Sequence, residues 1–291
     1  MISLRKALIF CAAALVPAGL ALSWIGGSAM VEGESSIVPA AAFPARDIEL
    51  RSLDGLRLAG TYWPGRQPHS PAVLLLHGVK SSRISTAAAA ARLSSRGYAV
   101  LTIDFRGHGE SAMATRSFGL HEALDAQAAF DWLKKRQSGA RVAIVGHSLG
   151  GAAALLGPQG PIPADALVLQ AVYPDIRRAI RNRIAERLTA VPAYLLEPLL
   201  SFQSKPRLGV MPDTLSPLEA LRHFHGPVFV MGGEDDRYTP PEETRALFAA
   251  APGRKKLWLV PGRGHAAMGD LRDQGYYARL DEFLQQTIGH P

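Results

Sequence analysis

Short apolar runs alternate with helical segments along most of the chain. Six runs are continuously apolar and bounded by Gly, Pro or charged residues, at 72–76, 98–103, 142–145, 166–169, 228–231 and 257–260. Runs of this kind are typical of strands covered on both faces. Helical candidates lie between and after them, at 85–96, 121–136, 149–156, 241–250 and 268–286. This alternation predicts a mostly parallel sheet with helices on both faces.

Two segments depart from the alternation. Residues 47–51 and 56–63 alternate around the turn dipeptide Asp54-Gly55, which predicts an antiparallel hairpin before the parallel strands. Between about 173 and 215 there is no strand candidate. We expect a small helical cap inserted into the sheet scheme there.

The cap begins with a basic amphipathic pattern. Apolar residues recur every four positions in it, at Ile176, Ile180, Ile184 and Leu188. Arginines lie between them, at Arg177, Arg178, Arg181, Arg183 and Arg187. Two interpretations stay open: solvated charge on a lid helix, or a face that docks on anionic lipid. We expect Tyr173, Tyr194 and Phe202 on the apolar underside of the cap, where contact with an acyl chain is the alternative to simple packing.

The N-terminal segment carries an uncharged apolar run. Residues 7–31 contain no charged side chain, and Arg5 and Lys6 precede them. About 20 apolar residues suffice to cross a bilayer, and the positive-inside rule would move the rest of the chain across. The small residues at 27–29 fit a cleaved signal peptide as the competing interpretation.

These patterns predict three parts of the chain. They are a signal-anchor or signal peptide at 1–31, a tether at 32–45, and a folded body at 46–291 that carries the cap at about 173–215. The predicted location is membrane-anchored with the body on the periplasmic or extracellular side, or secreted after signal cleavage.

Composition excludes several classes of protein. Hydrophobic residues make up 47% and charged residues 20% of the 291-residue chain, as in ordinary globular proteins. The one cysteine, Cys11, lies in the N-terminal apolar run, which excludes an intramolecular disulfide and a cysteine nucleophile in the body. The net charge of +7 comes without a dense basic block interleaved with aromatics, so we expect no nucleic-acid partner. No histidine set has metal-ligand spacing.

A G-x-S-x-G motif at 146–150 carries the chemistry. It follows the apolar run at 142–145 and opens the Ala-rich helical candidate at 149–156. This strand-turn-helix setting is the one that a nucleophile elbow requires. Its glycines permit a strained turn, and Ser148 lies at a helix N-terminus.

A serine nucleophile needs a base and an orienting acid. In this kind of fold the acid precedes the histidine along the chain. Asp236 follows the run at 228–231, with Asp235 as a rival, and His265 follows the run at 257–260. Both lie just past the carboxyl ends of strands, where open α/β sheets place their sites.

Together these motifs resemble the α/β-hydrolase superfamily of serine hydrolases, over about residue 46 to the C-terminus. Besides the elbow, the matching segments are Leu76-His77-Gly78-Val79, D-x-R-G-H-G-x-S at 104–111, G-x-x-D-x-x-x-P at 233–240, and His265. The position of the insertion is similar to the bacterial branch with esterases and acyl-aminoacyl-peptidase-like enzymes. The chain lacks the HGGG run of the hormone-sensitive-lipase branch. It also has Ser148 where haloalkane dehalogenases and epoxide hydrolases have Asp.

The resemblance implies a fold and a mechanism. The fold is an α/β-hydrolase fold with a small helical cap, and the activity is hydrolysis of carboxylic esters on a small-molecule or lipid-like acyl substrate. Ser148 would attack, His265 would transfer the proton, and Asp236 would orient the imidazole. The backbone N–H groups of Val79 and Leu149 would hold the oxyanion. No metal or organic cofactor is needed.

Two kinds of alternative stay open. Peptidase, thioesterase and acyltransferase activities share the same acyl-enzyme, so motifs do not separate them. A non-catalytic member of the fold that binds a lipid or a partner is the second. Around the site, we expect Arg106 to brace its loop by ion pairing, His77 and His108 to stabilise turns, and His147 to line the pocket or pack within the elbow.

Overall fold

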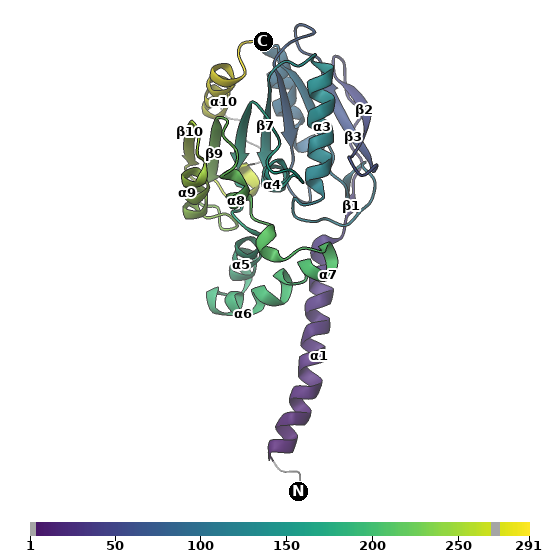
Figure 1. The fold of residues 1–291 in the computed structure, drawn as a ribbon, viewed down its shortest axis with the longest axis vertical. Coiled ribbons are helices and arrows are strands. Elements are labelled where there is room, and N and C mark those ends of the chain that lie inside the picture. The colour runs from purple at the N-terminus through teal and green to yellow at the C-terminus, as the bar shows by residue number, and fades with distance from the viewer. Residues whose placement is uncertain (1–3, 269–273) are drawn as a thin grey trace.

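The protein is built on one eight-stranded sheet, seen in a computed structural model that describes residues 4–268 and 274–291, and of 4–16 and 274 the backbone alone (Figure 1). Its strands are β2 (Arg46–Arg51), β3 (Arg57–Trp63), β4 (Ala72–Leu76), β5 (Ala99–Ile103), β7 (Val142–His147), β8 (Ala166–Gln170), β9 (Val228–Gly233) and β10 (Lys255–Val260). Their order is β10-β9-β8-β7-β4-β5-β3-β2. β3 pairs antiparallel with β2 and β5, and the other pairs are parallel. The predicted mostly parallel sheet with a leading hairpin is confirmed.

Helices cover both faces of the sheet. On one face lie α3 (Glu122–Arg136), α4 (Leu149–Leu155), α8 (Pro217–Leu221) and α9 (Pro241–Ala250), and on the other lie α2 (Ala87–Ser95) and α10 (Gln274–Thr287). Alternate residues of β4 serve the two layers: Leu74 and Leu76 pack with the first, Val73 and Leu75 with the second. This explains why the strands are apolar throughout.

Two helices begin later than the sequence predicts. The segment predicted as a helix from 85 opens as a 3-10 turn, η1 (Arg83–Thr86), and α2 follows. The backbone N–H of Arg83 donates to Asp104 Oδ1 at 2.6 Å, which ties the turn to the end of β5. For the helix predicted from 268, the structure has η3 (Ala266–Met268) and then α10, and residues 269–273 lie outside the described residues.

The interval between β8 and β9 is helical. Before α8 it contains α5 (Ile176–Arg187), α6 (Ala190–Ser201), α7 (Ser204–Leu208) and η2 (Pro212–Thr214). Figure 1 places these helices together at one end of the body, below the sheet. Asp175 caps α5 by accepting the N–H of Arg178 at 2.8 Å.

Part of the predicted cap orientation is wrong. Tyr173 is buried, but Tyr194 and Phe202 are 61% and 45% exposed to solvent. α5 holds them there by its arginines, because Arg181 stacks over Tyr194 at 4.2 Å. The prediction that the arginines of α5 are simply solvated holds only in part. Arg177 and Arg181 bind the buried Glu197 of α6 at 3.0 and 3.3 Å.

The N-terminal helix α1 (Leu4–Val31) projects from the body at the cap end (Figure 1). Ser23 Oγ donates to the Leu199 carbonyl of α6 at 2.7 Å, and Arg207 lies over the Trp24 ring at 3.8 Å. Throughout the part of the chain that the structure describes, no helix combines the length and apolarity needed to cross a membrane. The predicted membrane span is therefore not supported by the structure.

The segment predicted as a tether lies along the body. Its strand β1 (Glu34–Ser35) pairs in parallel with β6 (His108–Gly109). The guanidinium of Arg116 donates to the Glu32 carbonyl, and Val38 is buried. These contacts connect the chain that follows α1 with the loop after β5.

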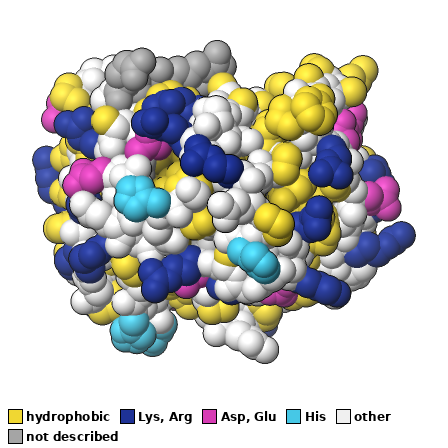
Figure 2. All heavy atoms as spheres, turned by 90° about the horizontal axis from the view of Figure 1, so that it is seen from above, with side chains coloured by type: hydrophobic (Ala, Val, Ile, Leu, Met, Phe, Trp, Pro, Cys, Tyr) yellow, Lys and Arg dark blue, Asp and Glu magenta, His cyan; other side chains and the backbone are white. Residues whose placement is uncertain are grey.

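Basic and acidic side chains are mixed on the face of the protein that Figure 2 shows. Figure 2 views the end opposite the projecting part of α1, and its Lys and Arg side chains are spread around the face with Asp and Glu among them. No continuous basic block forms on the described residues of this face.

Candidate active site

Ser148 lies in a strained turn between β7 and α4. Its φ of +48° is unusual for a residue with a side chain. The flanking glycines make the turn possible: a Cβ on Gly150 would lie 2.3 Å from the Leu76 carbonyl oxygen, and one on Gly146 would lie 2.5 Å from the Gly151 nitrogen. The N–H of Ser148 donates to the Gln170 carbonyl at 2.8 Å. The spacing of small residues in the motif is thus required by the packing of β7 and α4 against β4.

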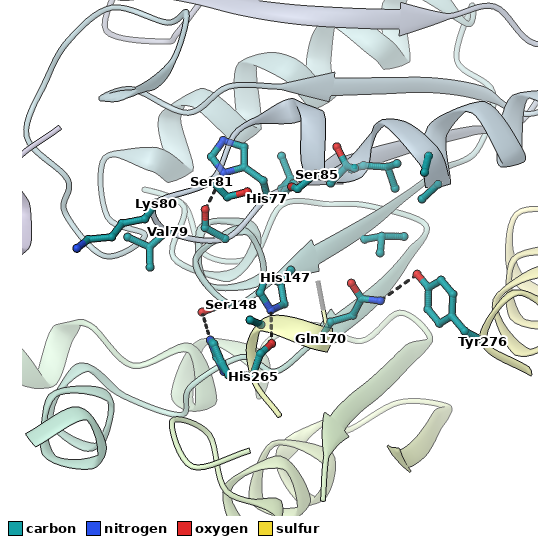
Figure 3. Close-up of a pocket in the computed structure, with 18 of the residues that line it drawn as sticks. His77, Val79, Lys80, Ser81, Ser85, His147, Ser148, Gln170, His265 and Tyr276 are labelled. Atoms are coloured by element: carbon teal, nitrogen blue, oxygen red, sulfur yellow. Dashed lines mark hydrogen bonds between the residues drawn. The ribbon is translucent and has the colours of Figure 1, made fainter. Parts of the chain in front are cut away.

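Three predicted site residues meet at the carboxyl edge of the sheet. His265 Nε2 lies 3.1 Å from Ser148 Oγ, and His265 Nδ1 lies 2.9 Å from Asp236 Oδ2. The other carboxylate oxygen of Asp236 accepts the backbone N–H groups of Tyr238 and Thr239 at 2.9 and 2.8 Å. These bonds fix the carboxylate so that it faces the imidazole. Figure 3 shows Ser148 and His265 turned toward each other.

The geometry separates Asp236 from its rival. Asp236 is buried and bonded to His265, whereas Asp235 is exposed. The N–H of Asp235 donates to the Arg263 carbonyl at 3.0 Å, which turns that residue along the outside of the loop. Of the two, Asp236 is the acid placed to orient the histidine.

The two predicted oxyanion donors lie beside Ser148. Val79 follows β4, and Leu149 is the first residue of α4. Among the described residues, neither N–H donates to a protein acceptor. Both are therefore available to an oxygen placed next to Ser148 Oγ.

A cavity of about 330 Å³ opens beside Ser148 and His265. Its walls combine the turn at 77–79 with polar side chains such as Gln170, whose amide donates to Tyr276 Oη at 2.9 Å (Figure 3). Apolar walls are supplied by Leu75, Ala88, Ala89 and Val145. A volume of this size accommodates a small acyl group.

Two histidines near the site are neutral. Burial, and then the neighbouring His265, lower the pKa of His147 to about 4. Burial, and then His108, lower the pKa of His77 to about 3. The Nδ1–H of His77 donates to the Gly78 carbonyl at 2.7 Å while its Nε2 accepts the Phe105 N–H at 3.1 Å. The predicted turn-stabilising role of His77 is confirmed.

The side chain of His147 lies beside His265 in the site. It lines the cavity, and its ring lies 5.3 Å from the ring of His265. Its Nε2 is 3.2 Å from the His265 carbonyl oxygen (Figure 3). Gly78 accommodates this ring, because a Cβ there would lie 2.6 Å from His147 Nδ1. His147 thus packs within the elbow and lines the pocket at the same time.

The loop after β5 is braced as predicted. Arg106 binds the buried carboxylate of Asp125 at 2.7 Å and the exposed carboxylate of Asp54 at 2.7 Å. Asp104 binds the guanidinium of Arg83 and accepts the N–H of Glu110 at 3.0 Å. These ion pairs hold the loop that supports His77.

One charged residue that lines a cavity was named from the sequence only as one of five arginines of the cap. Arg183 of α5 lines a second cavity that also contains Ser148. It is seven residues after Ile176 and three after Ile180, which places it on the inward stripe of α5. That spacing was the sequence signal that Arg183 lies on the inward face, but the other arginines of the same helix obscured it.

No metal centre is evident among the residues that the structure describes, where no three His, Cys, Asp or Glu side chains gather to hold an ion.

The comparisons with known proteins agree with this architecture. A family model described as the alpha/beta hydrolase family matches residues 73–279, so the chain belongs to that family. An esterase from Pyrococcus furiosus has a similar fold, with a TM-score of 0.72 and 22% identity over 89% of this chain and 99% of that one. A thermophilic esterase from Thermogutta terrifontis has a TM-score of 0.58 at 21% identity, over 84% of this chain and 100% of that one.

Two relatives in sequence are a bacterial protein and a lipase. An uncharacterised protein of Mycobacterium tuberculosis is 33% identical over 88% of this chain and 84% of its own length. The lysophosphatidylserine lipase ABHD12 of Macaca fascicularis is 31% identical over 68% of this chain and 50% of its own length. The match thus spans about half of the lipase.

Proposed function

We propose that the protein is a serine hydrolase that cleaves carboxylic esters through an acyl-enzyme on Ser148. The observation that carries the proposal is the hydrogen-bonded series from Ser148 Oγ through His265 to Asp236. A serine hydroxyl is a poor nucleophile until a base removes its proton, and this arrangement provides the base and its orienting acid.

The proposed reaction has two steps. Ser148 Oγ attacks the ester carbonyl while His265 Nε2 takes its proton, and the imidazolium then protonates the departing alcohol. Water next attacks the acyl group, with His265 again as base, and releases the carboxylic acid. In both steps the N–H groups of Val79 and Leu149 would stabilise the oxyanion, where one such donor contributes about 3–4 kcal/mol in related chemistry.

An ester or lipid substrate is favoured by several features. Similar proteins include esterases and a lysophosphatidylserine lipase. The cavity beside Ser148 combines apolar walls with the polar oxyanion turn, as acyl binding requires. We therefore propose a small-molecule or lipid-like acyl ester as the substrate class.

The direct test is labelling with a fluorophosphonate probe. Wild-type protein, Ser148→Ala and Ser85→Ala are compared, and the adduct is located by mass spectrometry. Ser85 is the matched control because it lines the same cavity. Labelling that disappears in Ser148→Ala and persists in Ser85→Ala supports the proposal. Folded wild-type protein that takes no label contradicts it and favours a non-catalytic binding role.

A substrate panel separates the activities that share an acyl-enzyme. Esters of increasing chain length, aminoacyl amides, thioesters and added alcohol acceptors are tested on unlabelled wild-type protein, with Ser148→Ala as the blank. Faster turnover of esters than of amides or thioesters supports esterase activity. Faster turnover of amides or of thioesters would identify a peptidase or a thioesterase on the same residues. Transfer of the acyl group to the added alcohol would identify an acyltransferase.

We also propose that the body lies outside the cytoplasm, tethered by its N-terminal segment. The uncharged run at 7–31 after Arg5 and Lys6 supports this placement. So do Val191 and Leu195 of α6, which are both 72% exposed on the helix that contacts α1. Protease treatment of bacterial spheroplasts that express the full chain tests it. Digestion of the body supports export, and protection of the body contradicts it.

A further inference from the structure

Ser148 borders two cavities. The larger one lies beside His265 and Tyr276, and a smaller one of about 40 Å³ lies under the cap. Val79 and Ser148 line both, so an ester bound beside Ser148 would have access to each of them. The two sides of a scissile ester would therefore occupy different surroundings.

The smaller cavity is lined mostly by apolar side chains, with the hydroxyl residues Ser148 and Tyr173 and one cation among them. Arg183 lines it from α5. The apolar walls are supplied by Met30, Val79, Phe118, Tyr173 and Ile180. One water needs about 10–15 Å³ of such volume, so the cavity holds about three waters. That space fits a carboxylate or phosphate group and excludes a long acyl chain.

Arg183 lacks the direct ion pair that three neighbouring arginines make, although the carboxylates of Asp236 and Glu186 attract it from a greater distance. Arg177 and Arg181 bind Glu197, and Arg178 binds Asp175 at 3.4 Å. Among the described residues, no carboxylate lies within ion-pair distance of Arg183. Arg187 also makes no ion pair with any described residue, but it is exposed to water and does not line the cavity.

The guanidinium of Arg183 directly contacts neutral groups, while the carboxylates of Asp236 and Glu186 act on it from beyond ion-pair distance. Its Nη1 donates to the Ala179 carbonyl at 2.9 Å, and the group lies 5.0 Å from the ring of Tyr238. The same ring lies 5.4 Å from that of His265. Burial lowers the pKa of Arg183, which reflects the cost of holding the charge there. A guanidinium has five N–H donors, so most of them remain for a ligand.

We propose that Arg183 forms an anion subsite that selects esters carrying a carboxylate or phosphate close to the scissile bond. The inference rests on the proposed function, because it names the substrate class of the same site. A bound anion would supply the direct ion pair that Arg183 lacks, and a charge-assisted bidentate bond to a half-buried guanidinium is strong. A neutral ester would leave the cation unpaired and gain nothing from it.

The test compares three esters that differ in one group. They are 1-butyrylglycerol, 1-butyrylglycerol 3-phosphate and O-butyrylglycerate, with butyrate release as the readout. For Arg183→Gln we expect the ratio of kcat/KM for an anionic ester to that for the neutral ester to fall about 10- to 100-fold. Arg183→Lys keeps the charge without the planar donors and should lose part of the ratio. Arg178→Gln, on the exposed side of α5, is the matched control, with the ratio retained.

The phosphate and carboxylate arms identify the anion. A larger loss for 1-butyrylglycerol 3-phosphate assigns the subsite to phosphate, and a larger loss for O-butyrylglycerate assigns it to carboxylate. If Arg183→Gln lowers kcat/KM for all three esters equally, the subsite is refuted while ester hydrolysis stands.

Binding is measured separately from turnover. The three esters are titrated into Ser148→Ala protein and into the Ser148→Ala, Arg183→Gln double variant by calorimetry. We expect the second substitution to weaken binding of the anionic esters about 10- to 100-fold. Equal binding by the two proteins would overturn the subsite, even in a protein that hydrolyses none of the esters.

Discussion

Glu243 connects the cap to the acid loop and makes stability depend on pH. It is buried on α9, and its Oε1 accepts the amide of Asn182 of α5 at 2.9 Å. The same amide donates to the Tyr238 carbonyl at 3.1 Å. Oε2 has no hydrogen-bond partner among the described residues. Burial raises the pKa of Glu243 to about 7 from 4.5, partly offset by the bond from Asn182 and by the charge of Arg178.

The direction of the effect follows from proton binding. Between pH 4.5 and about 7 the folded state binds more protons at Glu243 than the unfolded state does, so the free energy of unfolding decreases as pH rises through that window. At about 1.4 kcal/mol per pH unit, the change from pH 5 to pH 8 amounts to about 2–3 kcal/mol. The variant Glu243→Gln resembles the protonated carboxyl and lacks this dependence.

Urea denaturation of wild type and Glu243→Gln at both pH values measures the effect. We expect the variant to gain about 2–3 kcal/mol relative to wild type between pH 5 and pH 8. Glu242→Gln is the matched control, because Glu242 is the exposed neighbour on the same helix and should give no such change. An equal stability difference at the two pH values would refute the argument.

Three further variants test the geometry of the site. Asp236→Asn should lower kcat for a small ester about 10⁴-fold, since the imidazole loses its orienting acid, while the exposed Asp235→Asn should change it little; a comparable loss in both would contradict the assignment of the acid. Gly150→Ala places a Cβ 2.3 Å from a β4 carbonyl oxygen, so we expect probe labelling to slow strongly, and an unchanged labelling rate would contradict the tight elbow. Arg106→Met leaves Asp125 buried without its cation and should cost about 3–5 kcal/mol in urea denaturation, whereas a loss under about 1 kcal/mol would show that the ion pair matters little.

The sheet and the site positions could be predicted because both are local in the sequence. Strands buried on both faces are continuously apolar, so their bounds can be recognised without knowing their neighbours. The motif residues Ser148, Asp236 and His265 follow three such strands directly, and the carboxyl ends of parallel strands share one edge. Their meeting point is thus a consequence of topology.

Features that depend on packing between distant segments could not be predicted. The choice between Asp235 and Asp236 depends on which carboxylate the loop turns inward. α6 is apolar on much of its surface, so its sequence did not show that Tyr194 would face outward under Arg181. Arg183 differs from the other arginines of α5 in its surroundings and not in its local pattern.

The segment after α1 illustrates the same limit. Its Gly, Ser and Pro content is typical of a linker. In the structure it pairs as β1 with β6 in a short parallel ladder, a contact more than 70 residues away along the chain. Composition does not reveal such pairing, because the partner supplies the hydrogen bonds.

The central claim is that Ser148 carries the acyl group during turnover. The most direct measurement is rapid acid quenching of the protein with a 4-nitrophenyl ester, followed by mass spectrometry of the peptide that contains Ser148. The account predicts a burst of nitrophenol that matches the enzyme concentration and one acyl group on Ser148, both absent in Ser148→Ala. Ester hydrolysis at the wild-type rate by Ser148→Ala, or an acyl group on another residue, would contradict it.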